Sequence, residues 1–215
     1  MIGKQMPTNY DPQWLQWAKQ LQAISQIGLT YAQNPYDVER YEAIRQVAAE
    51  MMAVASTSDL KQVLDLFAGE VGYATPKIDT RGVVFRDEAL LLVKEAADGG
   101  WTLPGGWADV NDSPSEAVVR EIFEESGFQT RAVKLLAVYD RSRHPHTPPF
   151  PYHIYKLFFR CEIMGGVATR SMETMDIGFF REHEIPELSI SRVTPGQITR
   201  LFEHYHHPDW PTDFD

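Results

Sequence analysis

The sequence predicts an α/β domain with a mixed sheet, preceded by a small all-helical N-terminal domain. In residues 1–69, apolar side chains recur at three- and four-residue steps, which is typical of amphipathic helices. From residue 78 onward, short β-rich runs separated by turns replace that pattern. We therefore place the helical domain at residues 1–69, a linker at residues 70–77 and the α/β domain at residues 78–215.

The composition limits the classes of protein that this chain can belong to. Its 215 residues suffice for one ordinary domain plus a small one, and the formal net charge is -10. Such acidity argues against binding nucleic acid through a basic surface, but it allows a nucleotide whose phosphates arrive with a divalent metal. The single cysteine, Cys161, excludes a disulfide framework and is interpreted as a small buried hydrophobe. With no apolar run near ~18 residues and no signal peptide, we expect a cytoplasmic protein.

Three helices are predicted in the N-terminal domain. Asp11-Pro12 is expected to cap the first helix, and Asn34-Pro35 to end it. The second helix starts at about Asp37, residues 56–58 separate it from the third helix and cap that helix, and Gly69 closes the third. The expected apolar faces are Trp14, Trp17, Leu21, Ile24, Gly28 and Tyr31, then Tyr41, Ile44, Val47, Ala48 and Met51, and finally Leu60, Val63, Leu64 and Phe67. A segment of this length is only marginally stable by itself. We therefore expect these faces to pack on the second domain or on another copy of the chain.

Strands and two helices are predicted in the second domain. The strands are expected at residues 78–85, 89–95, 132–139, 153–161 and 177–180, and residues 101–103 lead from a turn into the Pro104-Gly105-Gly106 segment. A central helix covers residues 114–126, and a last helix opens at Thr194-Pro195 and runs to about His206. The acidic and aromatic tail after that helix is expected to dock on the other domain or on a partner subunit.

The central helix is bounded by strong local signals. Ser113, Pro114 and Glu116 form a capping box with proline at the first helical position, and Gly127 suits the C-terminal end. One arc of the helix is apolar and the opposite arc is acidic. The apolar arc holds Val118, Val119, Ile122 and Phe123, and the acidic arc holds Glu121, Glu124 and Glu125.

The acidic arc needs an explanation, since like charges at this spacing destabilise a helix by roughly a few tenths of a kcal/mol per pair. One explanation is a solvated face on which Arg120 pairs with Glu116 or Glu124. The other is a cation site, because clustered carboxylates suit Mg²⁺ or Mn²⁺. The adjoining Gly105-Gly106 pair, which lets backbone approach a ligand closely, favours the cation.

The spacing of these residues resembles the Nudix box, G-x5-E-x7-R-E-U-x-E-E-x-G-U, where U is a bulky aliphatic residue. The matching positions are Gly106, Asp112, Arg120, Glu121, Ile122, Glu124, Glu125, Gly127 and Phe128. Asp112 replaces the usual glutamate, and Phe128 replaces an aliphatic residue. The resemblance implies a Nudix hydrolase with an α/β/α sandwich over about residues 76–207.

A second resemblance covers nearly the whole chain. The N-terminal helices, the GYATPKID connector at residues 72–79 and the LPGGWAD segment at residues 103–109 are similar to a Nudix subgroup with an N-terminal helical domain. That subgroup is associated with hydrolysis of ADP-ribose and CDP-choline. The implied reaction cleaves the diphosphate of a nucleoside diphosphate linked to another moiety, giving a nucleoside monophosphate and a phosphorylated product.

The resemblance also implies roles for individual residues. Glu121, Glu124 and Glu125 would hold Mg²⁺ or Mn²⁺ over the loop at Gly106, and Arg120 would orient a carboxylate. The position of Asp112 in the pattern suggests support for the loop or for an outer metal. The box does not fix the general base. Glu173, in the polar stretch before residues 176–180, is our first candidate, and Glu125 is the alternative.

Substrate contacts are expected from residues 141–152, a proline-dense connection. Arg141 and Arg143 are candidates for phosphate, and Tyr152, with its neighbours in the loop, for a base, a sugar or a choline-like cation. Trp107, directly after the glycine pair, could stack on the substrate or cover the core. The sequence does not separate ADP-ribose from CDP-choline.

Two other functions are weighed against hydrolysis of a small nucleotide. A non-catalytic Nudix-like nucleotide sensor is disfavoured because all three glutamates are present. An RNA-processing Nudix enzyme is disfavoured by the acidic charge and the lack of a basic stripe. We also expect a homodimer formed through the N-terminal helices, and no membrane or nucleic-acid partner.

Overall fold

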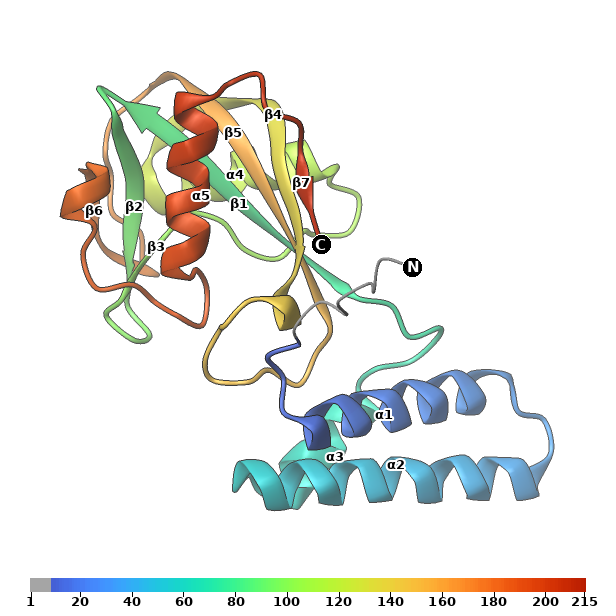
Figure 1. Ribbon diagram of the computed structural model, residues 1–215. Helices are drawn as coiled ribbons and strands as arrows, with labels where there is room; N and C mark the ends of the chain where they lie inside the picture. The colour runs from blue at the N-terminus through green and yellow to red at the C-terminus, as the bar shows by residue number, and fades with distance from the viewer. Residues whose placement is uncertain (1–8) are drawn as a thin grey trace, which may run out of the picture. The chain divides into compact units, whose positions relative to one another are not determined.

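The computed structural model describes residues 9–215, so the first eight residues of the predicted helical domain lie outside the described residues. The chain forms two compact units (Figure 1). One unit comprises residues 11–76 together with residues 149–153, and the other comprises residues 9–10, 77–148 and 154–215.

The helical unit contains the three predicted helices with shifted ends. They are α1 (Gln13–Tyr31), α2 (Pro35–Ser56) and α3 (Leu60–Ala68). Pro12, not Asp11, occupies the cap of α1, and Asn34 caps α2 by accepting the backbone N–H of Tyr36. The prediction that residues 56–58 cap α3 is wrong, because the Asp59 side chain accepts the N–H of Gln62. Gly69 ends α3 with a φ of -67°, which lies in the right-handed region, so this position does not require glycine.

Small side chains form much of the core of the helical unit. Its buried residues are Leu15, Ala18, Ala48, Ala49, Met52, Ala53, Val63 and Phe67. Because these alanines bring the helices close, larger apolar residues at neighbouring positions stay outside. Trp17 is 53% exposed and Tyr31 66% exposed, and Ile24 and Val47 are also exposed. These four members of the predicted apolar faces lie outside the core of the unit, which therefore presents apolar side chains that it does not bury itself.

The second unit is built on a mixed sheet, as predicted. Its strands are β1 (Lys77–Arg86), β2 (Ala89–Glu95), β3 (Trp101–Thr102), β4 (Phe128–Asp140), β5 (Ile154–Gly166), β6 (Thr174–Phe180) and β7 (Asp213–Phe214). Their order is β3-β2-β1-β5-β4-β7, and β6 pairs with β2. The β1–β5 and β4–β7 pairs are parallel, and the other pairs are antiparallel.

Two helices cover opposite faces of this sheet (Figure 1). Neighbouring strand residues alternate between the two cores. Val83 and Leu90 pack with α5 (Pro195–His206), whereas Val84 and Leu91 pack with α4 (Pro114–Ser126). Cys161 is buried on the α4 side, as predicted. The α/β/α arrangement expected from the family resemblance is confirmed.

The C-terminal tail docks on its own unit, so the prediction that it packs on the other domain or on a partner is wrong. Strand β7, which was not predicted, pairs with β4. The Lys134 ammonium donates to the carbonyl oxygens of Pro208 and Trp210, both at 2.6 Å. Arg200 of α5 forms a fork with Asp213, with one donor distance of 2.9 Å.

No helix among residues 9–215 combines the length and the apolar character needed to cross a membrane.

Candidate active site

The glycine loop that precedes α4 is fixed along strand β1. Hydrogen bonds run from the backbone N–H of Gly82 to the Pro104 oxygen and from the N–H of Thr80 to the Gly106 oxygen, both at 2.8 Å. Gly105 has a φ of +141°, and a Cβ there would lie 2.0 Å from the Thr80 oxygen. Both the backbone angle and this close approach require glycine at residue 105.

Helix α4 has the predicted bounds and the predicted capping box at Ser113 and Glu116. Its faces differ from the prediction at two positions. Phe123, expected in the core, is 51% exposed, and Glu125, expected on the acidic arc, is 6% exposed. The glycine loop and β6 cover the end of the helix: Thr174 Oγ1 donates to the Glu125 carbonyl at 2.9 Å.

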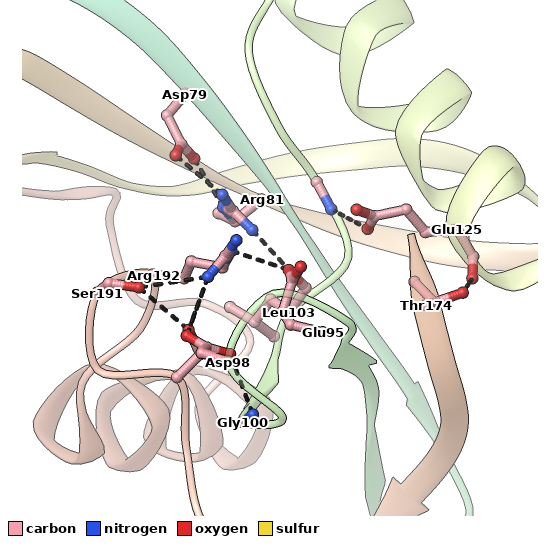
Figure 2. Close-up of polar contacts among 12 residues, drawn as sticks. Asp79, Arg81, Glu95, Asp98, Gly100, Leu103, Glu125, Thr174, Ser191 and Arg192 are labelled. Atoms are coloured by element: carbon pink, nitrogen blue, oxygen red, sulfur yellow. Dashed lines mark hydrogen bonds and ion pairs between the residues drawn. The ribbon is translucent and has the colours of Figure 1, made fainter. Parts of the chain in front are cut away.

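The Glu125 side chain is held by backbone, because the Gly105 N–H donates to its Oε2 at 2.8 Å (Figure 2). Burial raises the pKa of Glu125 to about 8, although the charge of Arg81 and the Gly105 N–H act in the opposite direction. The positive charge near this buried carboxylate does not offset the effect of burial on its pKa. A divalent cation nearby would favour its ionised form.

Arg120 forms hydrogen bonds with three carboxylates near the glycine loop, those of Asp112, Glu121 and Glu124. Its Nη1 donates to Glu121 Oε1 and to Glu124 Oε2, both at 2.9 Å, and its Nε donates to Asp112 Oδ2 at 3.1 Å. Of the two partners considered for Arg120, the structure shows Glu124, since Glu116 is engaged in the cap. Asp112, shorter than the glutamate of the family pattern, binds the arginine.

These residues fit a divalent metal in chemistry, although they are not assembled around one. Within residues 9–215, no group of three acidic, histidine or cysteine side chains converges closely enough to hold a metal ion. However, Glu121 and Glu124 both face the same guanidinium, which shows that two carboxylates of α4 can face one cation. Gly106 also leaves them room, because a Cβ there would lie 2.8 Å from Glu121 Oε2.

A buried ion network, missed in the sequence analysis, lies behind the glycine loop. Arg81 donates from Nε and Nη2 to the two oxygens of Asp79 (Figure 2). The Lys156 ammonium lies 2.9 Å from Asp79 Oδ2. Burial opposes ionisation of Asp79, but the two cations lower its pKa to about 2. The available signal was the two-residue spacing of Asp79 and Arg81, which places both side chains on one face of β1.

A second network joins the end of β2 to the turn before α5. Arg192 Nε lies 2.9 Å from Glu95 Oε1, and its Nη1 donates to Asp98 Oδ2 at 3.1 Å (Figure 2).

The backbone oxygen of Glu173 accepts the N–H of Ala96 at 3.0 Å. Glu173 therefore lies beside the end of β2 and directly before Thr174, which contacts α4. Its role as a base stays a prediction.

The predicted substrate residues belong to different segments of the chain. Arg141 is buried, and its Nη2 donates to the Pro148 oxygen at 2.9 Å, which holds its own loop. Arg143 lies 4.0 Å from Asp140 Oδ2, and Trp107 is partly exposed beside β1. Tyr152 belongs to the segment 149–153 of the helical unit. Substrate roles for these four residues stay predictions.

Comparison with known proteins identifies the family. Residues 76–202 match the family described as the NUDIX domain, and residues 12–67 match the family described as "UDP-X-like, N-terminal oligomerisation domain". The chain therefore belongs to the Nudix family. It is a Nudix hydrolase of the class that acts on a nucleoside diphosphate linked to another moiety.

Individual relatives are similar over most of the chain. The sequence is 47% identical to the putative ADP-ribose pyrophosphatase YjhB of Bacillus subtilis (strain 168), over 94% of this chain and 97% of that protein. A crystal structure of a UDP-X diphosphatase is 33% identical, with a TM-score of 0.61, covering 94% of this chain and 98% of the other. An ADP-ribose pyrophosphatase from Streptococcus suis 89-1591 is 35% identical, with a TM-score of 0.59, covering 66% of this chain and all of the other.

These relatives confirm three predictions made from sequence: the family, the fold class and the enzyme class. Nudix hydrolases generally use divalent metals, and their substrates are small nucleotides. Catalysis by the family disfavours the alternative of a non-catalytic sensor.

Proposed function

We propose that this protein hydrolyses the diphosphate of ADP-ribose with Mg²⁺ or Mn²⁺, producing AMP and ribose 5-phosphate. The observation that carries this proposal is the similarity to a putative ADP-ribose pyrophosphatase over nearly the full length of both chains. A UDP-linked substrate is the second candidate, because the UDP-X diphosphatase structure also spans nearly the whole of both chains. CDP-choline, suggested by the sequence, stays a prediction.

In this proposal, Glu121, Glu124 and Glu125 hold the cation above the Gly106 loop. When bound, a divalent cation offsets the charge that develops on the diphosphate oxygens and makes water easier to deprotonate. The Gly105 N–H fixes Glu125 at 2.8 Å, which supports a prepared position for that carboxylate.

Three further residues act with this set in the proposal. Arg120 positions Glu121 and Glu124, and Asp112 holds Arg120 in turn. Glu173 accepts the proton of the attacking water. If Glu125 were instead the base, the Glu173→Gln variant would keep its activity, so that variant decides between the two assignments.

A substrate panel tests the proposed function. Metal-free enzyme is given ADP-ribose, a UDP-sugar and CDP-choline, each with Mg²⁺, with Mn²⁺ or with EDTA, and the products are identified by chromatography. We expect kcat/KM for ADP-ribose to exceed that for the others by about tenfold or more, the discrimination that about 1.4 kcal/mol of differential binding provides. EDTA should abolish the reaction. A UDP-sugar cleaved faster than ADP-ribose would replace the first candidate with the second.

We further propose that the helical unit forms a homodimer. The support is its exposed apolar surface, to which Trp17, Ile24 and Tyr31 of α1 and Val54 of α2 contribute. Apolar patches of this kind on an otherwise polar surface are typical of protein–protein interfaces. The family description of residues 12–67 as an oligomerisation domain agrees with this proposal.

Sedimentation tests the dimer. At micromolar concentration, the wild type should sediment with twice the mass of one chain, and the double variant Trp17→Glu/Ile24→Glu should sediment as a monomer, because it places two charges in the apolar surface. Met164→Glu, an exposed apolar residue of β5 in the other unit, is the matched control and should stay dimeric. A monomeric wild type would contradict the proposal.

A further inference from the structure

Arg81 and Glu125 reach the same short loop from opposite faces of the sheet. A Cβ on Gly82 would lie 2.4 Å from Ile122, so residue 82 of β1 faces α4. Because neighbouring strand residues alternate, Arg81 points to the other face. The segment 103–106 runs along β1 between the two side chains, as Figure 2 shows.

Each of the three nitrogens of the Arg81 guanidinium donates a hydrogen bond. It is 5% exposed and donates to Asp79 at 2.7 and 2.9 Å and, from Nη1, to the Leu103 carbonyl oxygen at 3.2 Å. Lys156 also donates to Asp79 Oδ2, the oxygen that accepts from Arg81 Nη2, so Asp79 is held from two directions. Buried ion pairs contribute little net stability compared with apolar packing, so stability alone does not explain this arrangement.

Two residues after Leu103, the Gly105 N–H holds Glu125 Oε2. The loop therefore connects a buried cation on one face with a buried carboxylate on the other. Arg81 also attracts that carboxylate directly through its charge. The series therefore consists of two hydrogen bonds, Arg81 Nη1 to the Leu103 oxygen and the Gly105 N–H to Glu125 Oε2, joined by the backbone of residues 103–105.

We propose that Arg81 is a positioning residue for the reaction: by holding the Leu103 carbonyl, it sets the position of the Gly105 amide and thereby of the Glu125 carboxylate. In this proposal Arg81 acts through the loop and not on the substrate or the metal. The inference rests on the proposed function, in which Glu125 holds the cation, and it adds a residue from outside the Nudix box.

Arg81→Lys is the test variant, because it keeps the charge and loses the fork. Arg200→Lys is the matched control, because it breaks a similar arginine–aspartate fork, with Asp213, in the C-terminal part of the same unit. Mn²⁺ affinity is measured without substrate by the electron paramagnetic resonance signal of free Mn²⁺. Hydrogen exchange of the peptide covering residues 103–106 and the thermal midpoint are measured on the same samples.

We expect Arg81→Lys to weaken Mn²⁺ binding by about tenfold, to lower kcat by about a hundredfold with KM within about threefold, and to speed exchange at residues 103–106. Arg200→Lys should lower only the thermal midpoint. Arg81→Lys with wild-type Mn²⁺ affinity, kcat and exchange would overturn the inference.

Two further measurements keep the outcome decisive. If Arg81→Lys does not fold, Asp79→Asn replaces it, since the amide keeps the shape of the aspartate and weakens the fork. Unchanged exchange at residues 103–106 and unchanged Mn²⁺ affinity in Asp79→Asn would then refute the positioning role.

Glu125→Gln separates this inference from the proposed function. If Glu125→Gln binds Mn²⁺ as the wild type does, the metal assignment fails, whereas if only the Arg81 variants do so, the positioning role alone fails.

Discussion

Glu125→Gln and Glu124→Gln are each expected to lower kcat by about a hundred- to ten-thousandfold, which corresponds to about 3 to 5 kcal/mol of lost transition-state stabilisation. In our proposal both carboxylates hold the cation that offsets charge on the diphosphate, and an amide is a poor substitute as a metal ligand. The measurement is steady-state hydrolysis of ADP-ribose with saturating Mg²⁺ or Mn²⁺.

The fold should survive both substitutions. Glu125 is buried and its pKa is raised by burial, so a neutral amide of the same shape costs little there and removes an unfavourable charge. Glu124 is exposed at the helix surface. Thermal midpoints should therefore stay at or above that of the wild type. Glu162→Gln, which alters a surface pair with Arg131, is the control and should leave both activity and stability unchanged. Near-wild-type turnover by both variants would refute the metal assignment.

Gly105→Ala is expected to destabilise the enzyme by about 3 kcal/mol or more, since a Cβ would lie 2.0 Å from the Thr80 oxygen at a φ of +141°. The backbone fixes the position of the Cβ, and the atom it meets is a backbone oxygen, so no side-chain rotation relieves the clash. The variant should also lose activity, because the amide that holds Glu125 must move. Urea unfolding followed by circular dichroism measures the first effect, and ADP-ribose hydrolysis measures the second.

Gly106→Ala is the matched comparison for Gly105→Ala. At residue 106, the added Cβ would meet the flexible end of Glu121 rather than backbone, so the unfolding midpoint should change little. Activity should nevertheless fall, because Glu121 must shift away from the cation site. Equal unfolding midpoints for the wild type and both alanine variants would show that the glycine loop is not constrained as the structure indicates.

The parts of the fold that depend on local signals were predictable. Helix α4 begins at the capping box of Ser113 and ends at Gly127, and helix α5 begins at Thr194-Pro195; both have the predicted bounds. The Gly105-Gly106 pair was also correctly associated with the acidic face of α4. For both helices, the residues that determine the structure are neighbours in sequence.

Features that depend on distant residues were not predicted. Glu125 was placed with the exposed acids because its covering groups, Gly105 and Thr174, come from a loop and a strand remote from the helix in sequence. The Asp79–Arg81–Lys156 network needs the parallel register of β1 with β5, which no short pattern reveals. Strand β7 was missed for the same reason, since it exists only through pairing with β4.

The helical unit shows that periodicity does not identify the partner that covers an apolar face. Trp17, Ile24 and Tyr31 recur at helical spacing, and yet the core uses the smaller Ala18 and Ala48 instead. A pattern of large apolar residues indicates an amphipathic helix, but it does not say whether the face packs within the chain or on another copy. In the proposed dimer, the sequence pattern and the exposed surface are consistent.

The central claim is that the glutamates of α4 hold a divalent cation for cleavage of a nucleoside diphosphate linkage. The most direct measurement follows ADP-ribose by ³¹P NMR with metal-free enzyme before and after addition of Mg²⁺, in the wild type and in Glu125→Gln. We predict that the diphosphate signals persist without metal and that the wild type converts them on Mg²⁺ addition into the two phosphomonoester signals of AMP and ribose 5-phosphate, while Glu125→Gln does not. Conversion without metal, or equal conversion by Glu125→Gln, would contradict the claim.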